Sequence, residues 1–349
     1  MNKFILIISL LLPLFLLGNL ANAQELGIPD FGSEFETRVV PEYPGPNTKV
    51  NITTENYSTD LTRANFKWNI DGKLVLSGAG ERTFSFATAG LGIRREVLLQ
   101  VTSSEGRTFS KKFVFIPAVV DMLYQADSYT HPFYAGKAMP NSEGDVMVIA
   151  LPIFSQSGKR LSPAGLYYTW SRNFEPVTQA SGLGKNTYPL KISSIFGETN
   201  VKVVVKNTDG SLGAVGLLVL KPSNPEVLVY VDAPLSGTIY SNPITNSIKL
   251  TGDEVSLRAV DYFFPKSHRT KTANKSGLTY IWTLNGKQAV VDETTPDILT
   301  LRQNQNENTG SGQAGVAVSV RDPFDSLISA ARGFMIEFGG GSNSSNSFQ

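Results

Sequence analysis

The feature that most constrains the fold of this chain is a tryptophan motif that occurs three times. Each copy is an aromatic residue, one intervening residue and a tryptophan: Phe66-Lys67-Trp68, Tyr168-Thr169-Trp170 and Tyr280-Ile281-Trp282. Residues i and i+2 of a β-strand point to the same face of a sheet. Each motif therefore predicts a strand that places two large rings in one hydrophobic core. The six expected structural core residues are Phe66, Trp68, Tyr168, Trp170, Tyr280 and Trp282.

The sequence around each tryptophan repeats as well. An apolar or alternating segment precedes each motif, and three more follow it; the first to follow are Phe84-Ser85-Phe86, Tyr188-Pro189-Leu190 and Ile298-Leu299-Thr300-Leu301. Short strands at regular spacing, separated by turn residues, indicate antiparallel β-sandwiches. No stretch after the N-terminal segment has the pattern of a capped amphipathic helix. We therefore expect an all-β chain of three tandem antiparallel sandwiches.

The repeat also sets the expected domain boundaries. These are an extended N-terminal arm (24–44), sandwich one (45–119), a connector (120–143), sandwich two (144–222), a connector (223–249), sandwich three (250–338) and a disordered Gly/Ser/Asn tail (339–349).

The turn that follows the tryptophan differs between the copies. Asp71-Gly72 and Asn285-Gly286 are residue pairs that tolerate the positive φ of a tight hairpin turn. The middle copy has Asn173-Phe174-Glu175 at this place, which predicts a longer turn.

The aromatic-x-Trp motif, the Asp/Asn-Gly-Lys turn and the late Val-x-Val-x-Val strand resemble bacterial extracellular immunoglobulin-like domains, in particular the polycystic-kidney-disease type. The chain departs from that type because the acidic Gly-Asp-Gly run after its tryptophan is absent. The resemblance implies immunoglobulin-like sandwiches that act as spacer, adhesion or recognition modules of secreted or surface proteins. Fold alone does not establish a function.

Residues 1–23 have the pattern of a secretory signal peptide. Lys3 supplies the positive charge, an apolar segment follows, and Ala21-Asn22-Ala23 matches a cleavage site. An uncleaved membrane tether is the alternative. Lys3 is one of the 31 Lys and Arg residues of the chain, and the rest balance its 30 Asp and Glu residues. We therefore expect an exported mature chain without a transmembrane span, and no nucleic-acid partner.

The composition argues against an enzyme. The chain has no Cys and two His, which excludes disulfides, thiolate zinc sites and a cysteine nucleophile. His131 and His268 are expected at the surface, and neither accompanies a nucleophile motif. No catalytic residue, cofactor or metal site is therefore expected. A carboxylate pair in a glycosidase-like cleft and calcium bound by scattered carboxylates stay open, because both need only Asp and Glu.

The two connectors lack the Gly/Ser composition of a flexible tether. One interpretation is that each contains the first strand of the next sandwich and residues that pack between domains. The alternative is an aromatic ligand surface made by Tyr129, Phe133 and Tyr134.

The segment 265–275 is basic and contains no acidic residue. Its candidate ligand or partner contacts are Lys266, His268, Arg269, Lys271 and Lys275. Loops at the ends of sandwiches are common binding sites, so this loop could contact an anionic glycan or an acidic partner. The alternative is an ordinary solvated loop.

These observations predict an exported, non-enzymatic structural or adhesive protein of the bacterial cell envelope or surface. Its partner would be another envelope or surface protein, or an anionic glycan. Two alternatives stay open: an accessory component of an envelope assembly such as a pilus or secretion apparatus, and a carbohydrate-binding protein.

Overall fold

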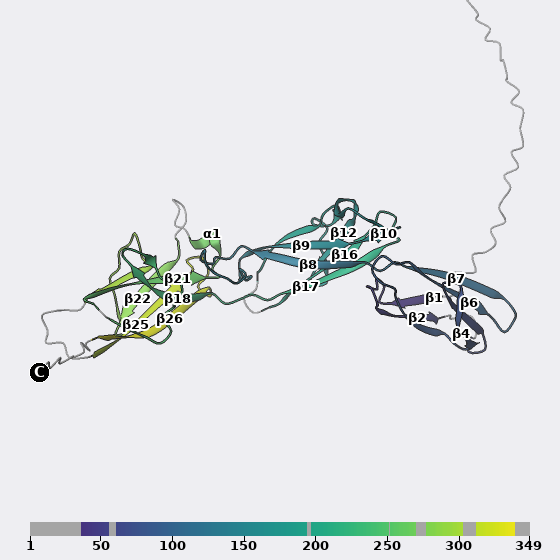
Figure 1. The fold of residues 1–349 in the computed structure, drawn as a ribbon, viewed down its shortest axis with the longest axis horizontal. Helices are drawn as coiled ribbons and strands as arrows, with labels where there is room; N and C mark the ends of the chain where they lie inside the picture. The colour runs from purple at the N-terminus through teal and green to yellow at the C-terminus, as the bar shows by residue number, and fades with distance from the viewer. Residues whose placement is uncertain are drawn as a thin grey trace, which may run out of the picture. The chain divides into compact units, whose positions relative to one another are not determined.

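The computed structural model describes residues 36–55, 61–193, 197–250, 252–269, 277–302 and 312–338. The expected signal peptide and C-terminal tail lie outside these residues. Within them, the chain consists of strands in several sheets (Figure 1), which confirms the all-β fold class. The helical segments described are the short turn η2 (Pro163–Gly165) and α1 (Lys266–Arg269). No helix in the described part of the chain has the length and apolar character that a membrane crossing requires.

The first pair of sheets surrounds Trp68. One sheet has the strand order β1-β2-β5 and the other β4-β3-β6-β7. Trp68 on β3 stacks on Phe84 on β5 with ring centroids 5.0 Å apart, so the two sheets meet at these rings. The strands are β1 (Glu36–Val40), β2 (Lys49–Glu55), β3 (Asn65–Ile70), β4 (Lys73–Ala79), β5 (Thr83–Ala87), β6 (Arg95–Thr102) and β7 (Thr108–Phe115).

Strand β1 corrects part of the expected N-terminal arm (24–44). It pairs antiparallel with β2 over its whole length, from Glu36 opposite Glu55 to Val40 opposite Asn51. Residues 36–40 therefore belong to the first sandwich. Their backbone groups are paired in the sheet. The prolines and glycines on either side of this segment predicted an extended arm outside the sheet.

The second pair of sheets surrounds Trp170. One sheet has the order β15-β9-β8, and the other has the order β13-β12-β16-β17 with β14 also paired to β12. The ring of Trp170 on β12 lies 5.6 Å from that of Tyr188 on β15. The strands are β8 (Val119–Ala126), β9 (Asp145–Ile153), β12 (Tyr167–Arg172), β13 (Glu175–Pro176), β14 (Gly182–Leu183), β15 (Thr187–Lys191), β16 (Thr199–Lys206) and β17 (Gly213–Leu220), with the small hairpin β10 (Ser155–Gln156) and β11 (Lys159–Arg160) beside them.

The third pair of sheets surrounds Trp282 in the same way. The sheet orders are β19-β18-β21-β24 and β20-β26-β25-β22-β23, and only β20 and β26 are described as parallel neighbours. The strands are β18 (Glu226–Ala233), β19 (Gly237–Thr238), β20 (Ser247–Lys249), β21 (Glu254–Tyr262), β22 (Thr279–Leu284), β23 (Lys287–Gln288), β24 (Ile298–Arg302), β25 (Gly312–Arg321) and β26 (Ser329–Phe338).

The three pairs share one topology. In each, two early strands and the strand that follows the tryptophan hairpin form one sheet. In the other sheet the tryptophan strand pairs with the next-to-last long strand, which pairs in turn with the last. This arrangement of two antiparallel sheets is that of an immunoglobulin-like sandwich. The immunoglobulin-like resemblance is thereby confirmed at the level of fold.

The connectors contain strands of the following sandwich. β8 lies almost entirely within 120–143 and pairs with β9 from Val119 opposite Ile153 to Ala126 opposite Val146. Within 223–249, β18 pairs with β21 and β20 pairs with β26. The boundaries of the second and third sandwiches therefore extend into both connectors, because these apolar strands complete the sheets.

The chain divides into two compact units. The described residues of one unit lie within 36–40, 51–86 and 96–114, and those of the other lie within 41–50, 87–95 and 115–338. The second and third sheet pairs belong to the same unit. The division into three separate domains therefore stays a prediction.

The turn after each tryptophan strand is the same in all three copies, so the longer turn expected at Asn173-Phe174 is wrong. The first turn residue is Asp71, Asn173 or Asn285, with φ of 48°, 47° and 48°. In each copy this residue makes two hydrogen bonds to one residue of the long strand that pairs with the tryptophan strand (β6, β16 or β25). Its N–H donates to the carbonyl oxygen of the partner residue, and its side-chain oxygen accepts the N–H of the same partner. The partners are Glu96, Asn200 and Gly315.

Candidate functional site

The segment 127–144 between β8 and β9, which we call the junction segment, joins the second sheet pair to the third. Tyr129 donates its N–H to the carbonyl oxygen of Phe264 over 2.9 Å, and Phe263 donates its N–H to the carbonyl oxygen of Tyr129 over 2.8 Å. The buried side-chain amide of Asn141 donates to the carbonyl oxygen of Phe263. The junction segment is therefore paired to the end of β21.

Aromatic rings fill the space behind these hydrogen bonds. His131 stacks on Tyr240 with ring centroids 4.6 Å apart and meets Tyr262 edge-on at 5.4 Å. Tyr134 also meets Tyr262 edge-on, at 5.7 Å, and the hydroxyl groups of Tyr230 and Tyr262 lie 2.8 Å apart. We call His131, Tyr134, Tyr230, Tyr240 and Tyr262 the junction cluster. Edge-to-face and stacked rings at these distances stabilise packing beyond their buried area.

The surface position expected for His131 is wrong, because this side chain is buried in the junction cluster. Its Nδ1 accepts the N–H of Phe133 over 3.0 Å. Burial lowers the pKa of His131, since the charged imidazolium loses its hydration there. Burial also raises the pKa of Tyr262. Both shifts favour the uncharged form of the side chain.

The structure separates the three residues of the expected aromatic ligand surface. Tyr134 belongs to the junction cluster, and Tyr129 lies beneath a guanidinium group with its ring centroid 3.2 Å from Cζ of Arg269. Phe133 is 76% exposed, and its ring lies 5.9 Å from that of Tyr240. Packing between the sheet pairs therefore occupies Tyr129 and Tyr134, and Phe133 presents its ring to solvent.

The basic residue Arg269, on α1, is held by a buried carboxylate. Both oxygens of Asp261 accept from the Arg269 guanidinium, with Nη2 3.0 Å from Oδ1, and the Tyr280 hydroxyl donates to the same Oδ1 over 2.9 Å. The Asp261 side chain is 2% exposed. Burial, reinforced by the Asp261 charge, raises the pKa of Tyr280. The Arg269 guanidinium of this pair lies over the Tyr129 ring, so one ion pair links α1, β21, β22 and the junction segment.

The other described residues of the basic loop are also paired. Nδ1 of His268 lies 2.7 Å from Oδ2 of the fully buried Asp322 carboxylate, and Nζ of Lys266 lies 3.2 Å from Oδ1 of Asp127. The structure thus brings Lys266, His268 and Arg269 together on α1, each with an aspartate. Lys271 and Lys275 lie outside the described residues.

The aspartates are the functional side chains that the sequence reasoning missed. Asp261 interrupts the apolar run of β21, and Asp322 follows the apolar strand β25. A carboxylate inside such a run is a signal, because buried charges are almost always paired. The sequence could not name the partner, since Asp322 is 54 positions from His268.

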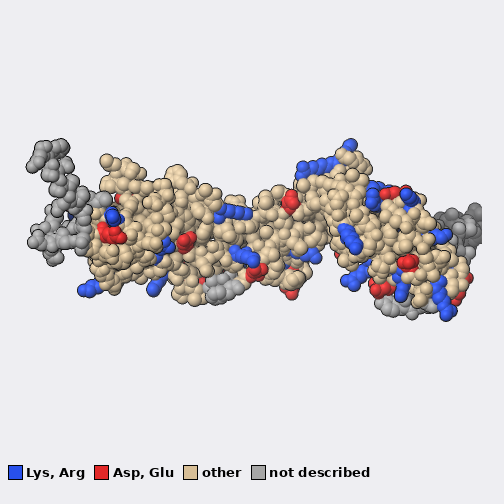
Figure 2. All heavy atoms as spheres, turned by 60° about the horizontal axis from the view of Figure 1, so that its bottom comes forward, with Lys and Arg blue, Asp and Glu red and all other residues tan. Residues whose placement is uncertain are grey.

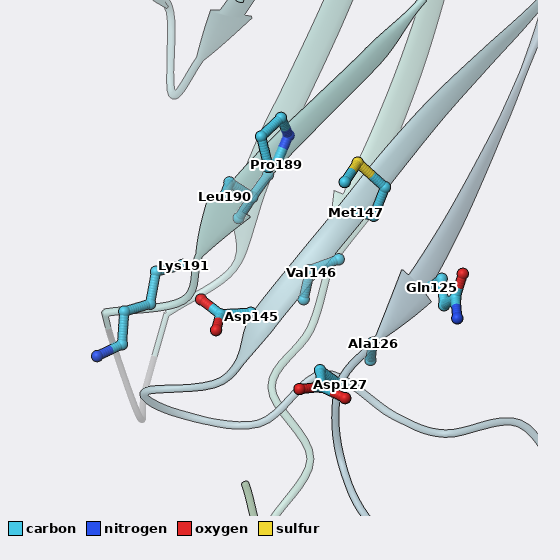
Figure 3. A pocket seen from close by; sticks show the side chains of 9 residues that line it. All are labelled: Gln125, Ala126, Asp127, Asp145, Val146, Met147, Pro189, Leu190 and Lys191. Atoms are coloured by element: carbon cyan, nitrogen blue, oxygen red, sulfur yellow. The ribbon is translucent and has the colours of Figure 1, made fainter. Parts of the chain in front are cut away.

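A hollow of about 500 Å³ lies over β8, β9 and β15, near the start of the junction segment (Figure 3). Ala126, Val146 and Leu190 form its buried part, while Asp145 and Lys191 lie at one end of it in the figure. The Lys191 ammonium is 2.7 Å from Oε2 of Glu143, and this hydrogen bond raises the pKa of Lys191. No Ser, Thr, Cys or His lines the hollow, so it holds no nucleophile with a histidine base.

Charge is dispersed over the face drawn in Figure 2, where basic and acidic side chains are interspersed between larger uncharged areas. Among the described residues, no three His, Cys, Asp or Glu side chains gather in a way that could hold a metal ion. Around the junction, the polar side chains of Asn141, His268 and Arg269 are bonded to other groups of the chain.

The chain was compared with known proteins. No family model matches it, and no curated protein matches its sequence. The polycystic-kidney-disease type therefore stays a prediction.

Several matching solved structures cover most of the chain, among them the following three. The three N-terminal domains of the bacteriophage RB49 highly immunogenic outer capsid protein are 16% identical, with 88% of this chain and 98% of that chain covered and a TM-score of 0.23. The central fibronectin-III array of RIM-binding protein is 9% identical, with 84% and 92% covered and a TM-score of 0.27. The Bacteroides ovatus mixed-linkage glucan utilization locus SGBP-B is 11% identical, with 87% and 70% covered and a TM-score of 0.22. Values this low assign this chain to no family and to no function.

Proposed function

We propose that this chain is an exported, non-enzymatic structural or adhesive protein of the bacterial envelope or surface. In this proposal the second and third sheet pairs act as one stiff unit that presents its loops in a set orientation. Export rests on the signal-peptide pattern of residues 1–23.

The observation that carries the proposal is the junction. Domains that move independently are typically joined by a flexible, Gly/Ser-rich tether. This chain instead buries His131 and Asn141 of the junction segment against the third sheet pair. It also packs the ring of Tyr129 against the guanidinium of the Arg269–Asp261 ion pair. Such contacts restrain the two sheet pairs relative to each other, which suits a protein that transmits position or force and has no role in turnover.

The anionic glycan is the less supported partner. Lys266, His268 and Arg269 are each engaged by an aspartate, so their charges are largely compensated within the chain. A protein partner in the envelope or at the surface is therefore the partner that we propose.

A specific observation favours the assembly component as the second candidate. β4 is an edge strand, and its Leu74 and Val75 side chains are 51% and 54% exposed. An exposed apolar edge strand can accept a strand from another chain. A pilus or secretion component could add a strand there.

The test is fractionation of the native organism followed by cross-linked purification of the tagged full chain. The proposal expects the protein in an exported fraction and accessible to added protease if it lies on the surface. Co-purification at a fixed ratio with one set of proteins would favour the assembly component, whereas binding of the purified chain alone to cells would favour adhesion. Retention in the cytoplasm, or catalytic turnover by the purified chain, would contradict the proposal.

The variant Asn141→Ala, with Asn224→Ala as its exposed control, tests the contribution of the junction. If a stiff junction matters for function, Asn141→Ala weakens cell or envelope binding and Asn224→Ala does not. Equal binding by both variants would show that binding does not depend on the junction.

A further inference from the structure

Phe174 occupies a backbone conformation that glycine occupies in the two equivalent turns of this same chain. The second turn residue is Gly72 in the first copy and Gly286 in the third, with φ of 82° and 78°. Phe174 has a φ of 72°. In this left-handed region the Cβ of an L-residue crowds the backbone, and a bulky side chain there is rare.

The Phe174 ring contributes little to the packing of the fold. The Phe174 side chain is 91% exposed, so its ring gains almost no burial within the chain. The turn itself is held by Asn173, whose N–H and side-chain oxygen both bond to Asn200. Because the other copies make the same two bonds with glycine at the second position, the turn needs no aromatic ring.

We propose that Phe174 is a partner-contact residue whose ring enters an apolar pocket of another protein in the envelope or at the surface. The inference rests on the proposed function, because it names one contact of the proposed protein partner. Strained residues that the fold does not require are concentrated at functional positions. A protruding aromatic side chain that fills a partner's pocket is a typical dominant contact in protein interfaces.

The surroundings of the ring favour a protein over a lipid surface or a sugar. Arg172 and Glu175 are opposite each other in the β12–β13 hairpin, so the charges that flank the ring cancel. Attraction to an anionic lipid surface needs an excess of basic residues. A sugar site needs polar groups beside the ring that are available to sugar hydroxyls. Here Arg172 donates to the Ser193 hydroxyl, and the side-chain oxygen of Asn173 accepts the N–H of Asn200.

The test uses substitutions that separate the ring from the turn. Phe174→Gly restores the residue of the sibling turns, Phe174→Asn supplies another residue that tolerates this conformation, and Phe174→Tyr keeps the ring. Leu235→Asn is the matched control, because Leu235 is a fully exposed apolar residue of another hairpin. Each full-length variant is measured for its thermal midpoint and for co-sedimentation with three probes. The probes are envelopes of the native organism, the same envelopes stripped by protease, and vesicles of the extracted lipids.

We expect Phe174→Gly and Phe174→Asn to melt at or above the wild-type temperature, because the strain is removed. The same two variants should bind untreated envelopes at least tenfold more weakly, whereas Phe174→Tyr and Leu235→Asn should bind like the wild type. Protease treatment of the envelopes should abolish wild-type binding, and the lipid vesicles should not retain the chain.

Two kinds of failure are distinguishable. If wild-type binding is intact in Phe174→Gly, the inference is overturned while the proposed function stands. Wild-type binding that persists on stripped envelopes or lipid vesicles also overturns it, because the contact is then with glycan or lipid. A wild-type chain that binds none of the envelope probes contradicts the proposed function itself, and with it this inference.

Discussion

The indole nitrogen of Trp170 donates a 2.9 Å hydrogen bond to the carbonyl oxygen of Lys185, two residues before β15 begins. This bond ties the tryptophan strand of one sheet to the entry of a strand in the facing sheet. The same relationship joins the other two tryptophans to residues two positions before β5 and β24, in the pairs Trp68–Glu81 and Trp282–Pro296. The internal repeat is therefore a repeat of hydrogen bonding as well as of buried rings.

Replacement of Trp170 by alanine should destabilise the chain by about 3–5 kcal/mol. The side chain is fully buried, and a buried aromatic ring of this kind removes roughly 150–250 Å² from water. Urea denaturation followed by circular dichroism measures the loss. Trp170→Phe should lose less stability, because it keeps a buried aromatic ring, although it gives up the hydrogen bond to Lys185. The exposed control Val290→Ala should stay within about 0.5 kcal/mol of the wild type. An unchanged midpoint for Trp170→Ala would contradict the structural role.

Removal of the Asn141 side chain should loosen the junction. Asn141→Ala leaves the buried carbonyl oxygen of Phe263 without its side-chain donor, which costs about 1–3 kcal/mol. Hydrogen exchange should then accelerate at the amides of Tyr129 and Phe263, which pair across the junction. Asn224→Ala, at an exposed position, should leave these rates unchanged. Slow exchange in Asn141→Ala would show that the backbone pairing holds without this amide.

Loss of the Arg269 guanidinium should be costly because it leaves a buried charge. Arg269→Met keeps the length of the side chain and leaves Asp261 with the Tyr280 hydroxyl as its side-chain donor, which costs about 3–5 kcal/mol. Thermal or urea unfolding of the full chain measures the effect. The double variant Arg269→Met with Asp261→Asn should recover part of the loss, because no charge is then buried. If the single variant is as stable as the wild type, the pair does not anchor α1.

Stability should fall as the pH drops below about 6.5, partly because of His131. The pKa of His131 is lower in the folded chain than the ordinary value of 6.5, because the ring is buried. Below pH 6.5 the unfolded chain therefore binds more protons than the folded chain, so acidification favours unfolding. The rings that pack against His131 are those of Tyr134, Tyr240 and Tyr262, and none of these contacts supplies a carboxylate to an imidazolium.

The variant His131→Asn isolates this effect from other titrating groups. Its side-chain oxygen can accept the N–H of Phe133 as Nδ1 does in the wild type, but it does not titrate. Urea midpoints measured between pH 8 and pH 5 should fall less steeply for His131→Asn than for the wild type. Parallel pH profiles would show that His131 does not contribute.

Much of the sheet architecture followed from local sequence patterns. The alternation of apolar and polar residues around Trp68, Trp170 and Trp282 predicted strands that the structure contains. One local prediction is wrong at Phe174, where a bulky residue in place of glycine predicts a longer turn. The structure keeps the turn, since the Asn173–Asn200 hydrogen bonds hold it in place.

The candidate site was less accessible from the sequence. The basic composition of 265–275 marked a distinctive loop, and the aromatic residues of 120–143 marked the connector. Neither pattern indicated that Arg269 pairs with Asp261 and packs against Tyr129, because these residues come from three separate segments of the chain. The composition of a segment shows which charges it carries. It does not show which charges on other strands pair with them in the folded chain.

The sequence by itself determined that this chain is an all-β protein with a repeated tryptophan core, because strand periodicity and turn chemistry are properties of neighbouring residues. The tertiary structure decided the rest. It placed β1, β8 and β18 in the sheets, joined His131 to Tyr240, and gave His268 and Arg269 their buried aspartates. Those contacts link residues far apart in the chain. Their formation depends on the packing of whole sheets, which no local pattern encodes.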